Sequence, residues 1–478
     1  MFEAPVFRRS GAVLSVAAAL TLLGACSFTP TYERPPMPVA AAFPSYGAGG
    51  SATGPAASAV AWEDFFTDPR LKRLITSALA NNRDLRVAVL NVEQVRAQYQ
   101  IRRADQFPTL GAVASGSRQP GTNGSITSVY SVGLAVTAYE IDFFGRVASL
   151  KEAALAQYLA SEEGRKTAQI TLVATVANTY LSLLADEELL EITRQTLRTR
   201  EESLRLSKLR FDNGVTSELD YRLAESLAEA ARVAYAQQQR QRALDENALT
   251  LLVGQSVTAE LSAALPPLSQ ALLSDVPAGL PSDLLTSRPD IRQAEQLLLA
   301  SNANIGAARA AFFPRISLTV GLGSVSKQLS GLFDSDSFGI SLAPQALLPI
   351  FDAGRNTAGL ESSQAGQRIA VAQYERAIQV AFREVADSLA ARTTLVEQLR
   401  AQQAQAQAES VRFKLSDLRY QNGISSYLDL LDAQRSLFTA QQAVVQTRLA
   451  QLQSQVALYR ALGGGWKQGF EPAARVVP

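Results

Sequence analysis

The chain contains no histidine and only one cysteine among its 478 residues. Without histidine, Ser-His-Asp and Cys-His catalysis and His-ligated metal sites are excluded. The phosphate-binding Gly-x-x-x-x-Gly-Lys-Ser/Thr loop and a strand-linked Gly-x-Gly-x-x-Gly are also missing. Adjacent acids occur at Glu162-Glu163 and Glu201-Glu202. Because neighbouring positions do not share a helix face, we expect solvated surface there rather than a catalytic pair. The sequence predicts no enzyme, no cofactor and no metal site.

Net charge and long apolar runs are scarce as well. The formal net charge is +1, and the mean hydropathy is +0.02. The chain therefore lacks the basic excess that usually marks a nucleic-acid-binding domain. Outside the N-terminus, no stretch reaches the ~20 uninterrupted apolar residues of a spanning helix. If the chain crosses a membrane, we expect it to do so with strands.

The N-terminus has the layout of a bacterial signal peptide. Arg8 and Arg9 precede an apolar run over 11–23 that is too short to span a bilayer. Leu-Gly-Ala-Cys, ending at Cys26, resembles a lipobox, in which the cysteine is diacylated with chains such as palmitate and becomes the new N-terminus. The alternative is a chance cysteine in an ordinary signal. Ser27 stands where many bacteria place the aspartate that retains lipoproteins in the inner membrane, so we expect outer-membrane sorting.

One segment occurs twice. Residues 209–220, LRFDNGVTSELD, return at 418–429 as LRYQNGISSYLD. Each copy centres on an Asn-Gly turn, Asn213-Gly214 and Asn422-Gly423, between long proline-free stretches. Because both residue types tolerate positive φ, each copy predicts a sharp turn between two helices. A spacing of about 200 residues is too long for a solenoid and indicates a duplicated half-molecule.

The first half predicts two strands between helices. Within 128–140 the even positions from 130 to 138 are apolar and the odd positions between them small or polar, which gives a strand with one apolar face. Its length of about ten residues suits a tilted transmembrane strand. Segment 109–115 is a weaker strand, and the Gly/Ser-rich segment 116–127 reads as an exposed loop. The apolar positions of the stronger strand are Tyr130, Val132, Leu134, Val136 and Ala138.

Helix lengths give a second clue. A proline-free stretch over 147–212 predicts a helix of roughly 100 Å. Its length implies coiled-coil packing. Helices predicted over 84–104 and 217–253 add up to ~87 Å, so end to end they nearly match the long helix. The apolar stripe of the long helix is Ile170, Val173, Ala177, Tyr180 and Leu184.

These patterns divide the chain into a signal peptide, a tether, two repeats and a tail. The second half repeats the order of helix, strand, strand, long helix, turn and helix. We predict a signal peptide over 1–25 and a lipid-anchored Pro/Gly/Ala-rich tether over 26–61. The first repeat is 62–265, with strands at about 109–140 and helices at about 147–253; the second is 266–465, with strands at about 315–347 and helices at about 355–462; the tail is 466–478.

Four strands cannot close a barrel, because the smallest barrels need about eight. An open sheet edge is forbidden in lipid, so several chains would have to share one barrel. The element order, the Phe-Pro junctions before the strands, the lipobox and the segment LRYQNGISSYLDLLDAQRSL resemble the outer membrane factor (TolC/OprM) family, lipoprotein branch.

The resemblance implies a mainly α fold with a transmembrane β-barrel. Three identical chains would share a twelve-stranded barrel and a long periplasmic α-helical tunnel. The implied function is a passive outer-membrane exit duct of a tripartite efflux system, associated with multidrug resistance. Its implied partners are outer-membrane lipid, a periplasmic adaptor that opens the tip, and an inner-membrane pump.

The resemblance also implies site residues. The second hairpin would line a periplasmic gate at Leu428, Asp429, Asp432 and Arg435. Asp429 and Asp432 share a helix face, and three copies would make acidic rings that attract cations. The alternative for Asp429 is an ordinary first-turn acid favoured by the helix dipole.

The turns themselves would dock the adaptor, through Asn213, Gly214, Asn422 and Gly423. Family members often carry an arginine beside the turn glycine, where this chain has Gln421 and Ser425. We expect the pair Asp220 and Arg222, and the remaining Arg419 and Tyr420, to hold neighbouring hairpins together.

A second function class stays open at this level. The chain could be a surface-anchored helical coiled-coil protein with a structural or adhesive function. If the chain is a duct, its sequence leaves drugs, metal ions, aromatic compounds and peptides open as cargo.

Overall fold

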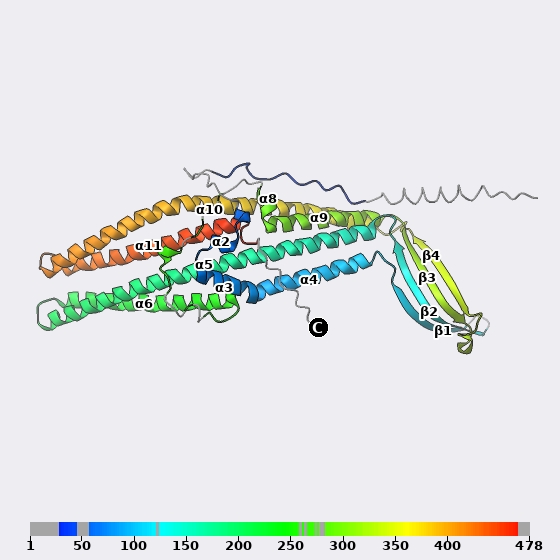
Figure 1. The fold of residues 1–478 in the computed structure, drawn as a ribbon, viewed down its shortest axis with the longest axis horizontal. Helices are drawn as coiled ribbons and strands as arrows, with labels where there is room; N and C mark the ends of the chain where they lie inside the picture. Colours follow the sequence, from blue (N-terminus) through cyan, green and yellow to red (C-terminus); the bar gives the residue numbers. More distant parts are fainter. Residues whose placement is uncertain are drawn as a thin grey trace, which may run out of the picture. The chain divides into compact units, whose positions relative to one another are not determined.

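The computed structural model describes residues 28–44, 57–120, 124–257, 261, 265–271, 273–274, 277 and 283–466 (Figure 1). The predicted signal peptide, Cys26 and the tail beyond residue 466 lie outside these residues. The chain forms two compact units. Unit 1 comprises Met1–Pro36, Asn91–Glu162 and Gln293–Glu375, and unit 2 comprises Met37–Leu90, Glu163–Arg292 and Arg376–Pro478. Each unit takes segments from both sequence repeats, so a repeat is not a compact unit.

The helices of the two repeats match almost residue for residue. Helices α4, α5 and α6 have 22, 67 and 36 residues, and helices α9, α10 and α11 have 22, 67 and 35. The predicted duplication and element order are confirmed. The bounds are α2 Trp62–Phe65, α3 Pro69–Asn81, α4 Arg83–Ala104, α5 Arg146–Asp212, α6 Glu218–Val253, α8 Leu284–Ser287, α9 Pro289–Ala310, α10 Arg355–Gln421 and α11 Tyr427–Ala461.

Local signals in the sequence explain where helices begin and end. The backbone N–H of Arg70 donates to Asp68 Oδ1 at 2.7 Å, and Pro69 is the first residue of α3. Helix α6 ends at Gly254, whose φ is 75°. A Cβ there would lie 2.5 Å from the carbonyl oxygen of Asn81, so only glycine fits.

The predicted apolar stripe of α5 is buried along its whole length. Ile170, Val173, Ala177, Tyr180 and Leu184 are all buried. One 18-residue window of α5 has a mean hydropathy of 1.3, long and apolar enough to cross a membrane by composition. Because 67% of that window is buried inside the protein, it has the character of a core helix.

The strands form one antiparallel sheet in unit 1, in the order β1-β2-β3-β4 (Figure 1). They are β1 Leu110–Pro120, β2 Ile126–Ile141, β3 Arg315–Ser326 and β4 Phe338–Leu347. The predicted loop over 116–127 was wrong at both ends, since β1 runs on to Pro120, which lies opposite Ile126. Pairing with β2 outweighs the weak strand propensity of Gly116 and its neighbours.

The sheet has one apolar face. Directly opposite residues of antiparallel strands share a face. The register therefore aligns Leu110, Val136, Val320 and Leu342 in one row, and Ala112, Leu134, Leu322 and Ile340 in the next. The other face carries small residues such as Gly111, Ala135, Gly321 and Ser341.

A β-bulge in β2 changes this alternation. The register with β3 shifts between Val136 and Tyr139, and Ala138 between them has a φ of 50°. The even-numbered apolar pattern predicted as far as Ala138 therefore stops at the bulge. Beyond it, Tyr139 and Ile141 join the apolar face, and Glu140 moves to the other face.

On this face of the sheet, Glu140 binds two arginines near the start of β3 and of α5. Its carboxylate accepts hydrogen bonds from Arg146 Nε at 2.8 Å and Nη2 at 2.6 Å. It also pairs with Arg315 Nε at 2.6 Å. Glu140 thus joins β2, β3 and the first residue of α5.

Segment 28–44, part of the predicted tether, has no helix or strand and packs against the protein. The Phe28 ring stacks on Phe313 at 4.6 Å. Asn302 Nδ2 donates to the carbonyl oxygen of Pro30 at 2.7 Å. Tyr32 and Arg34 both donate to Glu295 Oε1. The tether prediction missed these contacts because it used composition alone.

One predicted surface acid is buried. Glu163 is 6% exposed and pairs with Lys166 at 2.9 Å and with Arg292 at 2.8 Å. The prediction of a solvated surface was wrong for Glu163 and is confirmed for Glu201 and Glu202, which are exposed. The two positive partners of Glu163 offset the cost of burying its charge.

Candidate functional site

The candidate site lies in unit 2, at the turns of the hairpins α5–α6 and α10–α11. The two turns have the same geometry. The N–H of Val215 donates to the carbonyl of Arg210 at 2.8 Å, and the N–H of Ile424 donates to the carbonyl of Arg419 at 2.9 Å. Gly214 and Gly423 have φ of 70° and 69°. Both turns are Schellman motifs that end a long helix on a left-handed glycine.

The turn asparagines have a different task from the one predicted. Among the described residues, the only non-glycine positions with positive φ are Ala138 and Ala353, so neither asparagine uses a left-handed conformation. Instead, Asn213 Nδ2 donates to the Leu209 carbonyl at 2.7 Å, and Asn422 Nδ2 donates to the Leu418 carbonyl at 2.7 Å. Each amide adds a second donor to a carbonyl that already accepts from the backbone N–H of the same asparagine, which reinforces the last turn of the helix.

Asp429 is the third residue of α11 and forms a capping box with Ser426, the N-cap residue. Its backbone N–H donates to Ser426 Oγ at 3.3 Å, and its carboxylate accepts from the Ser426 N–H at 3.2 Å. This capping box fixes the start of the helix. In the first repeat, Asp220 stands in the same place and accepts from Thr216 Oγ1 at 2.8 Å and Ser217 Oγ at 2.9 Å.

The structure brings the four predicted gate residues onto one exposed face of α11. Leu428, Asp429, Asp432 and Arg435 are exposed, and Leu428 is 60% exposed. Asp432 forms an ion pair with Arg412 of α10. Arg412 was missed by the sequence analysis because its partner is twenty positions away in another helix.

Asp220 and Arg222 do not pair with each other within the chain, and their predicted role between neighbouring hairpins stays a prediction. Arg222 instead pairs with Glu225 at 2.9 Å and Glu218 at 3.4 Å, both on its own helix. Positions two apart point to different sides of a helix, so Asp220, which accepts from Thr216 and Ser217, does not meet Arg222.

Tyr420 connects the two hairpins. Arg210 Nη1 donates to the Tyr420 hydroxyl at 2.6 Å, and the Arg210 guanidinium lies 5.1 Å from the Tyr420 ring centre. The Tyr420 and Tyr427 rings lie 5.3 Å apart. Arg419 is exposed and contributes its carbonyl to the turn. The sequence analysis did not predict a role for Arg210. The repeat could have indicated one, because Arg210 in the first copy aligns with Arg419 in the second.

Below the turns, the two hairpins share a small apolar core. Burial of Tyr427 raises the pKa of its hydroxyl, as expected for a ring removed from water. The core consists of Ala224, Leu227, Tyr427, Leu430 and Leu431, with Leu204, Leu223, Phe413 and Tyr420 packed against it.

Comparisons with known proteins agree on one family. The family model "Outer membrane efflux protein" matches twice, over residues 74–255 and 280–464. The chain is 51% identical over 468 residues to the toluene efflux pump outer membrane protein TtgC of Pseudomonas putida, covering 95% of this chain and 96% of that protein. It is 47% identical over 464 residues to the outer membrane protein OprJ of Pseudomonas aeruginosa, covering 96% of each.

A solved structure shows the same architecture. The open state of the MtrE outer membrane channel of Neisseria gonorrhoeae superposes with a TM-score of 0.83 at 42% identity. The match covers 92% of this chain and 99% of that chain. The mostly helical chain with one small antiparallel sheet is thus the chain fold of solved outer membrane channels.

Proposed function

The chain belongs to the outer membrane efflux protein family and is an outer-membrane efflux channel, and we propose that it works as the passive exit duct of a tripartite pump. The observation that carries the proposal is a four-stranded sheet with one apolar face, made by the same chain as two long helical hairpins. The alternative of an adhesive coiled-coil protein accounts for the hairpins but leaves that apolar face without a purpose.

The sheet supports a barrel shared by three copies. Among the described residues, the outer edges of β1 and β4 pair with no strand. Each unpaired backbone group in lipid costs several kcal/mol, so the edges need partners, and further copies of the chain supply them. Three copies give twelve strands, an even number in the range of known barrels. The exposed apolar side chains that would face lipid include Leu110, Leu134, Leu322, Phe338, Ile340 and Leu342.

The duct would be gated at the hairpin turns. We assign the apolar constriction to Leu428 and the acidic ring to Asp432, with Arg435 one turn further along α11. Because Asp429 is held in the capping box, its first task is to fix the start of the helix. The ion pair with Arg412 balances the charge of Asp432 in the state described.

The gate is tested by single-channel recording. Asp432→Asn should lower the preference for cations over anions several-fold, because the ring loses a charge from each copy. The control is Asp212→Asn, which removes an exposed carboxylate paired with Lys208 at the end of the other hairpin. Equal selectivity of wild type and Asp432→Asn would exclude Asp432 from the gate.

Adaptor docking is assigned to the exposed turns, with Asn213-Gly214 and Asn422-Gly423 at their tips. The link between Arg210 and Tyr420 would hold the two hairpins of one chain together as the adaptor binds. A photo-crosslinking amino acid placed at Val215 or Ile424 should capture the adaptor in cells. Capture only by positions in unit 1 would contradict this assignment.

The lipid anchor is a separate proposal that rests on the lipobox-like sequence at Cys26. Cys26→Ser should abolish incorporation of labelled palmitate into the mature chain. The control is Ser27→Ala, which should be labelled normally. Undiminished labelling of Cys26→Ser would place the acyl group on another residue, whereas an unlabelled wild type would show an ordinary signal peptide.

The function itself is tested by efflux in a deletion strain. Loss of this protein should raise the retention of at least one compound in a panel of dyes, antibiotics and toluene, and the intact gene should restore efflux. Toluene is included because a relative is named for it. Unchanged retention of every compound, with the adaptor and pump present, would argue for the adhesive alternative.

A further inference from the structure

Arg200 of α5 is a buried cation with an unused donor. It is 6% exposed. Its Nη1 donates to the carbonyl oxygen of Leu227 at 3.3 Å. Its Nε–H has no hydrogen-bond partner among the described residues. A buried charged donor left unsatisfied costs more than a neutral one, so this site favours an acceptor.

In the part of the chain that the structure describes, no carboxylate pairs with Arg200. Burial lowers the pKa of the Arg200 guanidinium, and the positive charge of Arg435 lowers it further. Arg288 shows how the same fold treats another buried arginine. Its guanidinium pairs with Asp290 at 2.6 Å and with Glu384 at 2.8 Å. The lack of a carboxylate partner is therefore specific to Arg200 and is not shared by every buried arginine of this fold.

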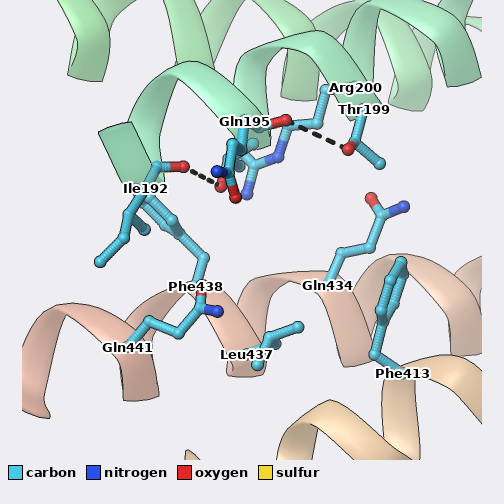
Figure 2. A pocket seen from close by; sticks show the side chains of 10 residues that line it. Ile192, Gln195, Thr199, Arg200, Phe413, Gln434, Leu437, Phe438 and Gln441 are labelled. Atoms are coloured by element: carbon cyan, nitrogen blue, oxygen red, sulfur yellow. Dashed lines mark hydrogen bonds between the residues drawn. The ribbon is translucent and has the colours of Figure 1, made fainter. Parts of the chain in front are cut away.

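Arg200 lines a cavity of about 140 Å³ between α5 and the hairpin α10–α11 (Figure 2). Apolar side chains form much of its wall, including Leu437 and Phe438. The Arg200 guanidinium carbon lies 5.5 Å from the centre of the Phe438 ring. The cavity thus combines one cation with an apolar lining.

Most polar groups of the wall are already used. The hydroxyl of Thr196 donates to the Ile192 carbonyl at 2.8 Å. The hydroxyl of Thr199 donates to the Gln195 carbonyl at 3.1 Å, marked by a dashed line in Figure 2. Gln195 Nε2 donates to Glu191 at 2.9 Å. Gln434, across the cavity on α11, is 9% exposed, and its Oε1 has no partner among the described residues. An amide flip of Gln434 would turn a donor toward the cavity.

We propose that this cavity binds a small organic monocarboxylate. Its carboxylate would accept hydrogen bonds from Arg200 Nε–H and from the Gln434 amide, and its apolar body would lie against Leu437 and Phe438. A guanidinium matches a carboxylate in geometry as well as in charge. An apolar cavity of about 150 Å³ holds one benzene-sized molecule, so the ligand has a short chain or a single ring.

Such a ligand would tie α5 to α11. Arg200 and Gln434 come from the two hairpins, and among the described residues neither Arg200 Nε nor Gln434 Oε1 has a hydrogen-bond partner. One bound carboxylate would accept hydrogen bonds from both Arg200 and Gln434, and this shared ligand would stabilise the packing of the two hairpins.

The test uses the detergent-purified full-length protein and butyrate as probe. At constant ionic strength, replacing chloride by butyrate should raise the unfolding midpoint saturably, and calorimetry should show one butyrate per chain. Neutral butyramide should give no shift. Arg200→Met should abolish the response, and Gln434→Met should weaken binding several-fold. The matched control is Arg198→Met, which removes an exposed arginine of the same helix and should respond as the wild type does.

Three results would overturn the proposal. One is no butyrate-dependent shift or heat in the wild type, which would leave water or a neighbouring chain's carboxylate as the occupant. Another is an equal response to chloride and butyrate, which would make the site a halide site. The last is a loss of the butyrate response in Arg198→Met as large as the loss in Arg200→Met. If Arg200→Met does not fold, the wild-type titration and Gln434→Met decide.

Discussion

Asp186 and Asp245 bring two carboxyl groups together between α5 and α6. Burial, and then the charge of Asp245, raise the pKa of Asp186 to about 7. Gln238 Nε2 donates to Asp186 Oδ1 at 2.9 Å. Arg242, which acts against the shift, is held by Glu187 at 2.6 Å and by Glu246 at 3.3 Å. At the residue scale, burial and the charge of Asp245 therefore favour the neutral, protonated form of Asp186.

This pair predicts a pH dependence of stability. A carboxyl whose pKa is raised on folding binds more protons in the folded state, so stability falls as pH rises from its unfolded pKa toward about 7. The unfolding midpoint of the wild type should therefore drop between pH 5 and pH 8 relative to Asp186→Asn. The check is circular dichroism melting at several pH values, with Asp212→Asn as the exposed control. Parallel curves for wild type and Asp186→Asn would contradict it.

At the scale of elements, two glycine requirements have different causes. In the turns, Gly214 and Gly423 have positive φ and open space around a Cβ, so conformation alone requires glycine. In the sheet, Gly133 and Gly323 lie opposite each other. A Cβ on Gly133 would come 2.3 Å from the Leu322 carbonyl oxygen, so space requires glycine there.

The turn requirement predicts opposite signs for two glycine replacements. Gly423→Ala should destabilise the protein by about 1 kcal/mol, because alanine resists the left-handed conformation. Gly359→Ala lies inside α10 with open space around its Cβ and should stabilise by up to about 1 kcal/mol. Urea unfolding of the two variants decides, and a stabilising Gly423→Ala would contradict the turn geometry.

The sheet requirement predicts loss of assembly. Gly133→Ala should lower the yield of membrane-inserted oligomer, because β2 and β3 would have to separate at their centre. Gly339→Ala in β4 meets nothing within 4 Å and should insert normally. Heat-treated and untreated membrane fractions on a gel measure the yield. Similar amounts of oligomer for both variants would show that the strands can give way.

At the scale of the whole molecule, the open sheet decides the assembly. The described strands leave two edges that water can satisfy and lipid cannot. The duplication supplies one hairpin of strands from each repeat, and β2 pairs with β3 across the repeats. A single chain therefore provides a segment of a barrel, and closure belongs to the oligomer.

This assembly should be visible as heat-modifiable migration. Unheated protein in mild detergent should run at about three times the mass of the boiled chain, because closed barrels resist detergent. Crosslinking before boiling should give a ladder that ends at three chains. A monomeric species in membranes, with or without heating, would exclude the shared barrel.

The sequence by itself determined the duplication, the helices, the turns and the apolar face of the strands. These features follow from local rules of period, proline placement and turn chemistry, and they also carried the resemblance to the outer membrane factor family. Only the tertiary structure decided which side chains meet. The bulge at Ala138 turned Glu140 toward Arg315, and Asp220 accepts from Thr216 and Ser217 rather than from Arg222. Arg200 is buried without an acidic partner among the described residues. Such pairings depend on register and packing between segments far apart in the chain, which no local pattern records.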